Sequence, residues 1–507
     1  MVFLHAHGVS TSRAVRIFRT YGQEAIAIVS ENPYRLARDI RGIGFLSADI
    51  IAQKIGIARD SPLRAQAGMS YALAEASSQG HCGLPYTQLV PLAVKLLDIP
   101  DAVIERAIAQ EITEEVVIPD TVEAEPCIFL APLYHAERSI AAQIERLKRG
   151  SPPWPEFEAG KAILWAEQKL SISLAESQKA ALRLALSSKL LVITGGPGVG
   201  KTTLVNSLLT ILRAEQVSAL LCAPTGRATK RLSEATTLKA QTIHRLLEIN
   251  PLNGQFKRNE ESRLECDLLI ADECSMIDIP LANQLLKAID THTAVIFVGD
   301  VDQLPSVGPG QFLADLIDSG SIPVIRLTEV FRQAASSRIV LNAHRINQGL
   351  YPSFPAKGED SDWYFVPEDE PEAIAATVVD LVSSRLPKKY DINPVRDIQV
   401  LCPMNRGLTG ARGLNQLLQN ALNPPGEHSL EKFGHVFSVG DKVMQIENKY
   451  DKDVYNGDIG FVAGIDREKE ELAVDFDGRK VNYAFGELDE LVLCYATTIH
   501  KSQGSEY

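Results

Sequence analysis

An eight-residue segment, GGPGVGKT (195–202), constrains the fold of this chain more than any other feature. It fits the pattern G-x-x-x-x-G-K-[ST], follows the apolar run KLLVIT and precedes the helical run TTLVNSLLTIL. Glycines let successive backbone N–H groups wrap around phosphates, and the start of the following helix adds positive potential. The segment therefore predicts a parallel α/β sheet with a phosphate-binding loop after one strand.

Two residues of this loop have side chains that are expected to bind the nucleotide or its metal ion. Lys201 is expected to neutralise the β and γ oxygens of ATP, and Thr202 is expected to be a ligand of Mg²⁺. The residues expected to hold the nucleotide are Gly195, Gly196, Pro197, Gly198, Val199, Gly200, Lys201, Thr202 and Thr203.

Polar side chains follow two further apolar strands. LLIADECSM (268–276) ends a strand in Asp272 and Glu273, which on their own would indicate only a solvated strand end. Together with the phosphate-binding loop they predict a catalytic pair, in which Asp272 holds Mg²⁺ and Glu273 is the general base for the attacking water. Gln303 follows the strand AVIFVGD and suits sensing of the γ-phosphate, although its residue type alone favours a capping role.

The periodicity of the chain changes at a Pro-rich segment, RGSPPWPEFE (149–158), which is typical of a linker. Helical patterns precede it, and strands alternating with helices follow it, as in a parallel α/β sheet. Short strands separated by turns within 426–490 predict a small β barrel. The predicted domains are a tandem helix-hairpin-helix (1–60), a helical, winged-helix-like region (61–148), a linker (149–158), a first αβα domain (159–328), a second αβα domain (329–425 and 491–507) and the barrel inserted in it (426–490).

Two N-terminal segments, 3–22 and 39–57, each place a glycine turn before an amphipathic helical pattern. In a helix-hairpin-helix such a turn lets backbone N–H groups approach a nucleic-acid phosphate without reading sequence. A helical packing module without a ligand is the alternative. In 61–148, helical patterns are followed by two predicted strands, EEVVIP (114–119) and PCIFLAPLY (126–134). A structural spacer is nearly as good an interpretation of this region as a winged helix.

Charge and cysteine content narrow the possible partners. The net charge of −13 alone argues against nucleic acid, but residues 221–258 hold seven Lys/Arg against two Glu. The seven cysteines form no CxxC pair, which argues against a zinc site and a disulfide framework. No apolar run approaches the roughly 18 residues of a membrane span, and no secretory signal is evident, so we expect a cytoplasmic protein without a membrane partner.

Seven segments carry a family resemblance in their order along the chain: GGPGVGKTT, APTGRA, TIHRLL, IADECSMID, VGDVDQLPSVGPG, LTEVFRQ and TTIHKSQGSEY. They resemble the motifs of RecD-like superfamily 1 helicases, and the tandem hairpins are similar to the long form of that family. The resemblance covers nearly the whole chain. It implies two RecA-like domains that clamp ATP and Mg²⁺ between them and move 5′ to 3′ on single-stranded DNA, in DNA repair or recombination.

The resemblance also implies roles for residues whose type alone says little. Gln178 matches the residue that recognises adenine, Arg332 an arginine finger, and Glu506 a contact to the ribose. Residues 248–266 resemble a hairpin that splits duplex DNA at a fork, with a plain surface hairpin as the alternative. The residues that match strand-contacting motifs are Thr225, Arg227, His244, Thr498, His500 and Lys501.

The sequence is also compatible with other functions. Relatives of this type have further residues at both ends, including a second arginine at the γ-phosphate, so we expect a fragment cut at both ends whose ATP turnover is weak. A nucleotide-gated DNA-binding scaffold without unwinding activity is one alternative, and the helicase half of a conjugative relaxase is another. No nuclease signature is found, and protein partners are not indicated.

Overall fold

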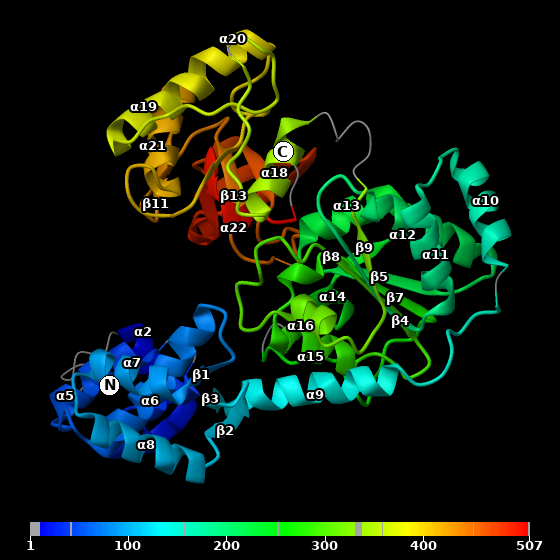
Figure 1. Ribbon diagram of the computed structural model, residues 1–507. Helices are drawn as coiled ribbons and strands as arrows, with labels where there is room; N and C mark the ends of the chain where they lie inside the picture. The colour runs from blue at the N-terminus through cyan, green and yellow to red at the C-terminus, as the bar shows by residue number, and fades with distance from the viewer. Residues whose placement is uncertain are drawn as a thin grey trace. The chain divides into compact units, whose positions relative to one another are not determined.

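The computed structural model describes residues 11–40, 43–156, 158–250, 253–329, 337–356, 358–449 and 451–504 (Figure 1). The chain divides into two compact units. The helical unit comprises Met1–Ile144, Asp278–Leu286 and Ser306–Gln311, and the motor unit comprises Glu145–Ile277, Lys287–Pro305 and Phe312–Tyr507.

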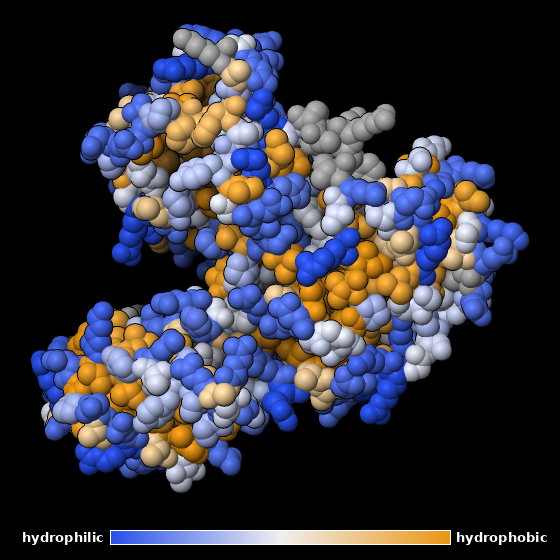
Figure 2. Space-filling model, in the orientation of Figure 1, coloured by the Kyte–Doolittle hydropathy of each residue, from blue (hydrophilic) through white to orange (hydrophobic). Residues whose placement is uncertain are grey.

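Helices and a three-stranded sheet build the helical unit. The strand order is β1-β3-β2, and both pairings are antiparallel. Figure 2 shows hydrophobic areas on this unit among predominantly hydrophilic residues. The elements are α2 (Thr11–Tyr21), η1 (Gly22–Glu24), α3 (Ala25–Glu31), α4 (Arg35–Asp39), α5 (Phe45–Ile55), α6 (Pro62–Ser78), β1 (Gly83–Pro85), α7 (Tyr86–Leu97), α8 (Asp101–Thr113), β2 (Val117–Val122) and β3 (Glu125–Leu130).

In this region one predicted strand is shorter than expected, and the two predicted glycine turns lie at least partly outside the described residues. The first predicted glycine turn, near Gly8, and Gly42 of the second lie outside the described residues. The predicted strand PCIFLAPLY ends at Leu130, and α9 (Ala131–Leu147) begins within it. Ala136, Ile140 and Ile144 are buried at four-residue spacing, and this helical period overrides the apolar run.

A buried ion pair lies inside the helical unit. Arg64 donates to both carboxylate oxygens of Asp49, from Nε at 2.8 Å and from Nη2 at 3.2 Å, and Tyr34 Oη donates to the same carboxylate at 2.7 Å. Both charged residues are less than a tenth exposed. Burial alone would raise the pKa of Asp49, but these hydrogen bonds and the charge of Arg64 lower it below its usual value.

This lowered pKa predicts that the helical unit loses stability in acid. A carboxyl group whose pKa is lower in the folded state stabilises the fold above its unfolded pKa of about 4, and the contribution disappears as the pH falls through the folded pKa. We therefore expect the stability difference between the wild type and Asp49→Asn to be full at pH 7 and to shrink below pH about 4. Unfolding followed by circular dichroism across this range measures it. A difference that stays constant with pH would contradict the prediction.

A six-stranded parallel sheet forms the centre of the motor unit, in the order β6-β5-β7-β8-β4-β9. The runs LLVIT, LLIA and AVIFVG are almost entirely buried, as expected for strands covered on both faces. The elements are α10 (Ala159–Leu170), α11 (Glu176–Ser187), β4 (Leu190–Gly195), α12 (Lys201–Ala214), β5 (Ala219–Ala223), α13 (Gly226–Thr236), β6 (Ala240–Thr242), α14 (Ile243–Leu246), β7 (Leu268–Ala271), η2 (Cys274–Met276), α15 (Ile279–Lys287, grouped mostly with the helical unit), β8 (Ala294–Gly299), α16 (Phe312–Asp318) and β9 (Val324–Leu327).

The second αβα region contains a smaller sheet within the described residues. Its strands β10 (Val400–Cys402) and β18 (Ala496–Thr498) pair in parallel, although the 93 residues from 403 to 495 lie between them in the sequence. Its helices are α18 (Arg338–Asn347), α19 (Pro371–Asp380), the π-helical turn η3 (Leu381–Arg385), α20 (Leu386–Tyr390), α21 (Ala411–Leu422) and α22 (Ile499–Ser502).

An antiparallel sheet in the order β16-β15-β14-β13-β17 is inserted between β10 and β18. Its fifth strand, β17 (Leu491–Leu493), lies beyond the boundary expected from the sequence, because it pairs with β13. The strands are β13 (Lys442–Gln445), β14 (Ile459–Asp466), β15 (Glu471–Phe476), β16 (Arg479–Ala484) and β17, preceded by the hairpin β11 (Leu430–Lys432) and β12 (His435–Phe437) and interrupted by η4 (Phe485–Glu490).

Candidate functional site

The phosphate-binding loop lies between β4 and α12, at the carboxyl end of the parallel sheet. Gly198 and Gly200 have φ values of 75° and 77°, a region that residues with a Cβ rarely adopt. Lys201 Nζ donates to the carbonyls of Gly195 and Gly196, at 2.5 and 3.1 Å. The lysine is therefore folded onto the loop itself, where its charge lies at the start of α12.

Acidic side chains gather beside this lysine from the ends of two neighbouring strands. Asp272 follows β7, Asp300 follows β8, and both are almost completely buried. Burial first, and then the charge of Glu273, raise the pKa of Asp272 to about 6, while Lys201 acts in the opposite direction. Burial also raises the pKa of Asp300, again opposed by Lys201. Carboxylate oxygens beside a phosphate loop are ligands of the kind that Mg²⁺ prefers.

Glu273 has an unusual backbone and an unusual partner. Its φ of 52° and ψ of 42° are left-handed, which is uncommon for a residue with a side chain and typical of functional sites. Glu273 Oε1 accepts a hydrogen bond from Arg231 Nη2 of α13 at 2.5 Å. Its other oxygen, Oε2, is buried and has no hydrogen-bond partner among the described residues. A water molecule at Oε2 could therefore donate to it.

The two glutamines of the predicted site have different surroundings. Gln178 is 1% exposed, accepts from the Ala175 N–H at 3.0 Å and donates to the Val199 carbonyl of the loop at 3.4 Å. Gln303 is exposed and donates to Asp300 Oδ2 at 3.4 Å, so it extends the acidic group after β8. Arg332 and Glu506 lie outside the described residues.

Three residues beside the loop were not singled out from the sequence. Asp300 could have been found, because it is an acid directly after an apolar strand. His344 of α18 lies against the loop, since a Cβ on Gly196 would come within 3.0 Å of its ring, and its buried Nε2 has no hydrogen-bond partner in the described part of the chain. Neither this histidine nor Arg231 has a sequence signal, because each acts through a contact between distant segments.

The residues expected to contact DNA occupy helix starts. Thr225 caps α13, its Oγ1 accepting from the Ala228 N–H at 3.3 Å, and Thr498 caps α22 in the same way. A Cβ on Gly504 would lie 3.1 Å from Thr225 Oγ1, so the end of the α22 segment comes close to the start of α13. The structure therefore brings together two segments of the motor unit that are far apart in the sequence. His500 and Lys501 are exposed on α22.

His244 connects this region to the predicted hairpin. Its ring centroid lies 5.8 Å from that of Phe256, and one antiparallel bridge joins Phe256 to Ile249. Gly254 turns the chain with φ of 72°. Within the described residues, the hairpin of 248–266 is thus limited to this bridge and its turn.

An open cavity of about 950 Å³ lies beside α13. Basic side chains from three parts of the motor unit line it, with acidic side chains among them. The cationic residues are Arg227, Lys230, Arg231, Arg396, Lys442 and Arg479, and the acidic ones are Glu234, Asp397, Asp453, Asp458 and Asp477. Such a lining can hold backbone phosphates, which are recognised by arginine and lysine.

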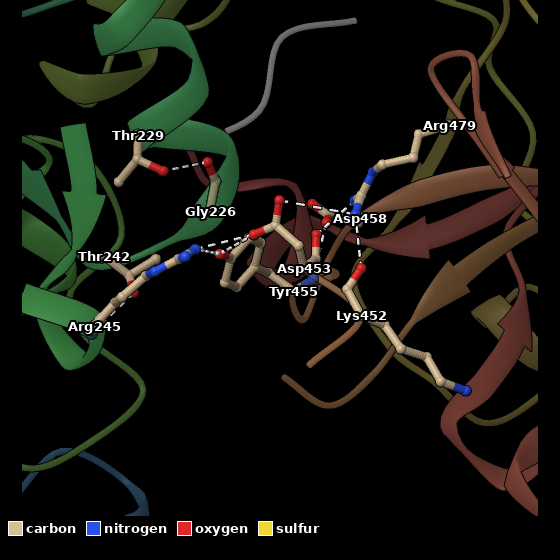
Figure 3. A network of polar contacts seen from close by, with 9 residues as sticks. All are labelled: Gly226, Thr229, Thr242, Arg245, Lys452, Asp453, Tyr455, Asp458 and Arg479. Carbon is tan, nitrogen blue, oxygen red and sulfur yellow. Dashed lines mark hydrogen bonds and ion pairs between the residues drawn. The ribbon is translucent and has the colours of Figure 1, made fainter. Parts of the chain in front are cut away.

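A polar network connects α13 and α14 to the inserted antiparallel sheet region (Figure 3). Arg245 donates to Asp453 Oδ1 at 3.0 Å and to Tyr455 Oη at 2.6 Å, while Arg479 holds the backbone carbonyl of Lys452 at 2.6 Å. Gly226 allows a close approach, because a Cβ there would lie 2.7 Å from the Tyr455 ring. The loop before β14 is thereby fixed to the start of α13.

These features define a P-loop domain with a cavity lined by charged side chains beside it. Comparison with known families agrees in three regions: an ATP-dependent RecD2 DNA helicase HHH domain over 1–83, an AAA domain over 178–309, and an ATP-dependent RecD-like DNA helicase SH3 domain over 414–476.

Whole-chain relatives extend this agreement. The chain is 34% identical to the ATP-dependent RecD2 DNA helicase of Deinococcus radiodurans, over 99% of this chain and 69% of that protein. It is also 34% identical to the RecBCD enzyme subunit RecD of Mycolicibacterium smegmatis, over 65% of this chain and 64% of that protein. The chain belongs to the RecD-like family of ATP-dependent DNA helicases.

Solved helicase structures show weaker similarity. The crystal structure of Pif1 helicase from Bacteroides in complex with ADP-AlF3 and ssDNA has a TM-score of 0.41 and 20% identity, over 66% of this chain and 84% of that one. Among the described residues, no helix is both long and apolar enough to cross a membrane.

Proposed function

We propose that this chain uses ATP hydrolysis to move 5′ to 3′ on single-stranded DNA and to open forked duplexes, in DNA repair or recombination in the cytoplasm. The observation that supports this most is the gathering of Lys201, Asp272 and Glu273 at one edge of the parallel sheet. Family membership supports an ATP-dependent helicase, and the specific direction, substrate and residue roles are our proposal.

The residues at the sheet edge fit a nucleotide and its metal ion. The Lys201 ammonium donates to two carbonyl oxygens of its own loop. We propose that it contacts the phosphates of ATP when the nucleotide is bound. Thr202 and Asp272 would hold Mg²⁺, which supplies charge neutralisation at the phosphates. Gln178 is proposed to recognise the adenine base, and Gln303 is proposed to sense the γ-phosphate.

Glu273 is proposed to accept the proton of the attacking water. Its unpartnered Oε2 supports this role, because a buried carboxylate oxygen without a donor is a site for water. Arg332 would stabilise charge in the transition state, and Glu506 would contact the ribose.

DNA is assigned to the surface formed by Thr225, Arg227, His244 and the α22 segment, Thr498, His500 and Lys501. The arginine and lysine side chains that line the cavity beside α13, among acidic ones, support a groove that follows the sugar-phosphate backbone. The turn at 248–266 would meet the duplex at a fork.

Strand displacement with the Glu273→Gln variant tests the proposed function. The wild-type chain is expected to hydrolyse ATP faster with single-stranded DNA and to unwind a duplex with a 5′ tail in preference to one with a 3′ tail. Glu273→Gln is expected to lower the rate of hydrolysis about 100-fold, since the base contributes roughly 10²–10⁴. A steady-state assay and a fluorescent fork measure both rates.

The control and the alternatives are read from the same assays. Lys169→Ala removes an exposed cation at the end of α10 and should change neither rate. Hydrolysis that is indifferent to DNA would contradict the motor assignment. ATP-dependent DNA binding without strand displacement would instead favour a scaffold.

A further inference from the structure

Glu273, which we assign as the general base, forms an ion pair with Arg231. Arg231 Nη2 donates to Glu273 Oε1 at 2.5 Å, and the Glu273 side chain is only 7% exposed. The guanidinium holds Oε1 and thereby fixes the direction of the whole carboxylate, including Oε2, which has no hydrogen-bond partner among the described residues. One of the two oxygens of Glu273 is therefore engaged.

The arginine of this pair lies on the helix that begins with the predicted DNA contacts. Thr225 caps α13, Arg227 is in its first turn, and Arg231 follows four residues later. Residues four apart share one face of a helix, with Cβ atoms about 5–6 Å apart. Both arginines line the same cavity. A DNA phosphate held by Arg227 is consequently within reach of Arg231.

We propose that Arg231 is a positioning residue that exchanges Glu273 for a DNA phosphate and so makes ATP hydrolysis depend on DNA. Without DNA, Arg231 holds Glu273. With DNA, phosphodiester oxygens offer the guanidinium a competing anion, and Glu273 is released toward the attacking water. The proposal rests on the proposed function, because it assumes that Glu273 is the base.

Reciprocity makes the exchange measurable without hydrolysis. If DNA must displace Glu273 from Arg231, the Glu273 charge weakens DNA binding by a coupling free energy. Removing that charge must then strengthen DNA binding by the same free energy. We expect Glu273→Gln to tighten binding of a fluorescent oligo-dT severalfold in the absence of nucleotide. Arg231→Ala should weaken binding severalfold, and Glu273→Gln should have no further effect in the Arg231→Ala background. Fluorescence anisotropy on the full chain measures all four affinities as a double-mutant cycle.

Hydrolysis provides a second measurement. Arg231→Ala is expected to raise the DNA-independent rate severalfold and to bring the ratio of DNA-stimulated to basal rate toward one. Arg231→Lys should retain part of the stimulation, since lysine keeps the charge but not the planar donor pair. Arg213→Ala, which removes an exposed arginine in the last turn of α12, is the matched control and should leave the ratio unchanged.

The possible outcomes separate this inference from the proposed function. Additive effects of the two substitutions on DNA affinity, or an unchanged stimulation ratio in Arg231→Ala, would overturn the role of Arg231 while leaving the helicase assignment intact. A wild-type chain that neither binds oligo-dT nor hydrolyses ATP would overturn both. If Arg231→Ala fails to fold, Glu273→Gln alone decides, because unchanged DNA affinity in that variant contradicts the exchange.

Discussion

Lys201→Ala is expected to lower the rate of ATP hydrolysis by about 100- to 1,000-fold, the usual cost of removing one preorganised group that stabilises charge in a transition state. The ammonium group lies at the start of α12, and its charge opposes the burial that raises the pKa values of Asp272 and Asp300. Alanine leaves the loop glycines in place but removes the positive charge that faces the phosphates. Single-turnover hydrolysis with saturating DNA measures the chemical step.

A folding defect would have to be excluded for this variant. Lys201 makes its hydrogen bonds to two loop carbonyls, so its loss should not change the cooperative unfolding of the sheet. We expect an unchanged melting temperature by tryptophan fluorescence. Hydrolysis within a factor of three of the wild type, in a folded variant, would show that the phosphate-binding loop does not carry the reaction.

The parallel sheet and the phosphate-binding loop could be predicted because their signals are local. Buried strands read as continuous apolar runs, and a loop that needs left-handed backbone at Gly198 and Gly200 reads as glycine. The acids after β7 followed from the same logic. The residues expected to contact DNA were predicted from the family resemblance, because composition and spacing indicated only a basic segment.

Contacts between distant segments could not be predicted in this way. Three such contacts are the pairing of Arg231 with Glu273, the approach of His344 to Gly196 and the hydrogen bond from Arg245 to Tyr455. In each case the two residues are far apart in the sequence, and no periodic pattern of residues connects them. The length of strand β3 was overestimated for a related reason, since APLY is apolar in either a strand or a helix. Tertiary packing of α9 decides between them.

The second large effect is expected in the helical unit, from Arg64→Ala. This change leaves the buried carboxylate of Asp49 with only the Tyr34 and Gln53 donors, and it also leaves the Leu97 carbonyl without the Arg64 donor at 2.8 Å. Removing one partner of a buried ion pair typically costs about 3–5 kcal/mol. We expect amides of α5 to α7 to lose hydrogen-exchange protection by this amount, which mass spectrometry of the full chain can measure.

The tryptophan residues provide an internal control for this prediction. Trp154, Trp165 and Trp363 all belong to the motor unit, so their fluorescence should report an unchanged transition in Arg64→Ala while circular dichroism reports earlier loss of helix. The double variant Arg64→Met, Asp49→Asn removes both charges and keeps an acceptor for the Tyr34 hydroxyl. It should therefore recover much of the lost stability, since replacing a buried pair by neutral groups is often close to neutral. A double variant as unstable as Arg64→Ala would show that packing of the arginine stem, and not the unpaired carboxylate, is responsible.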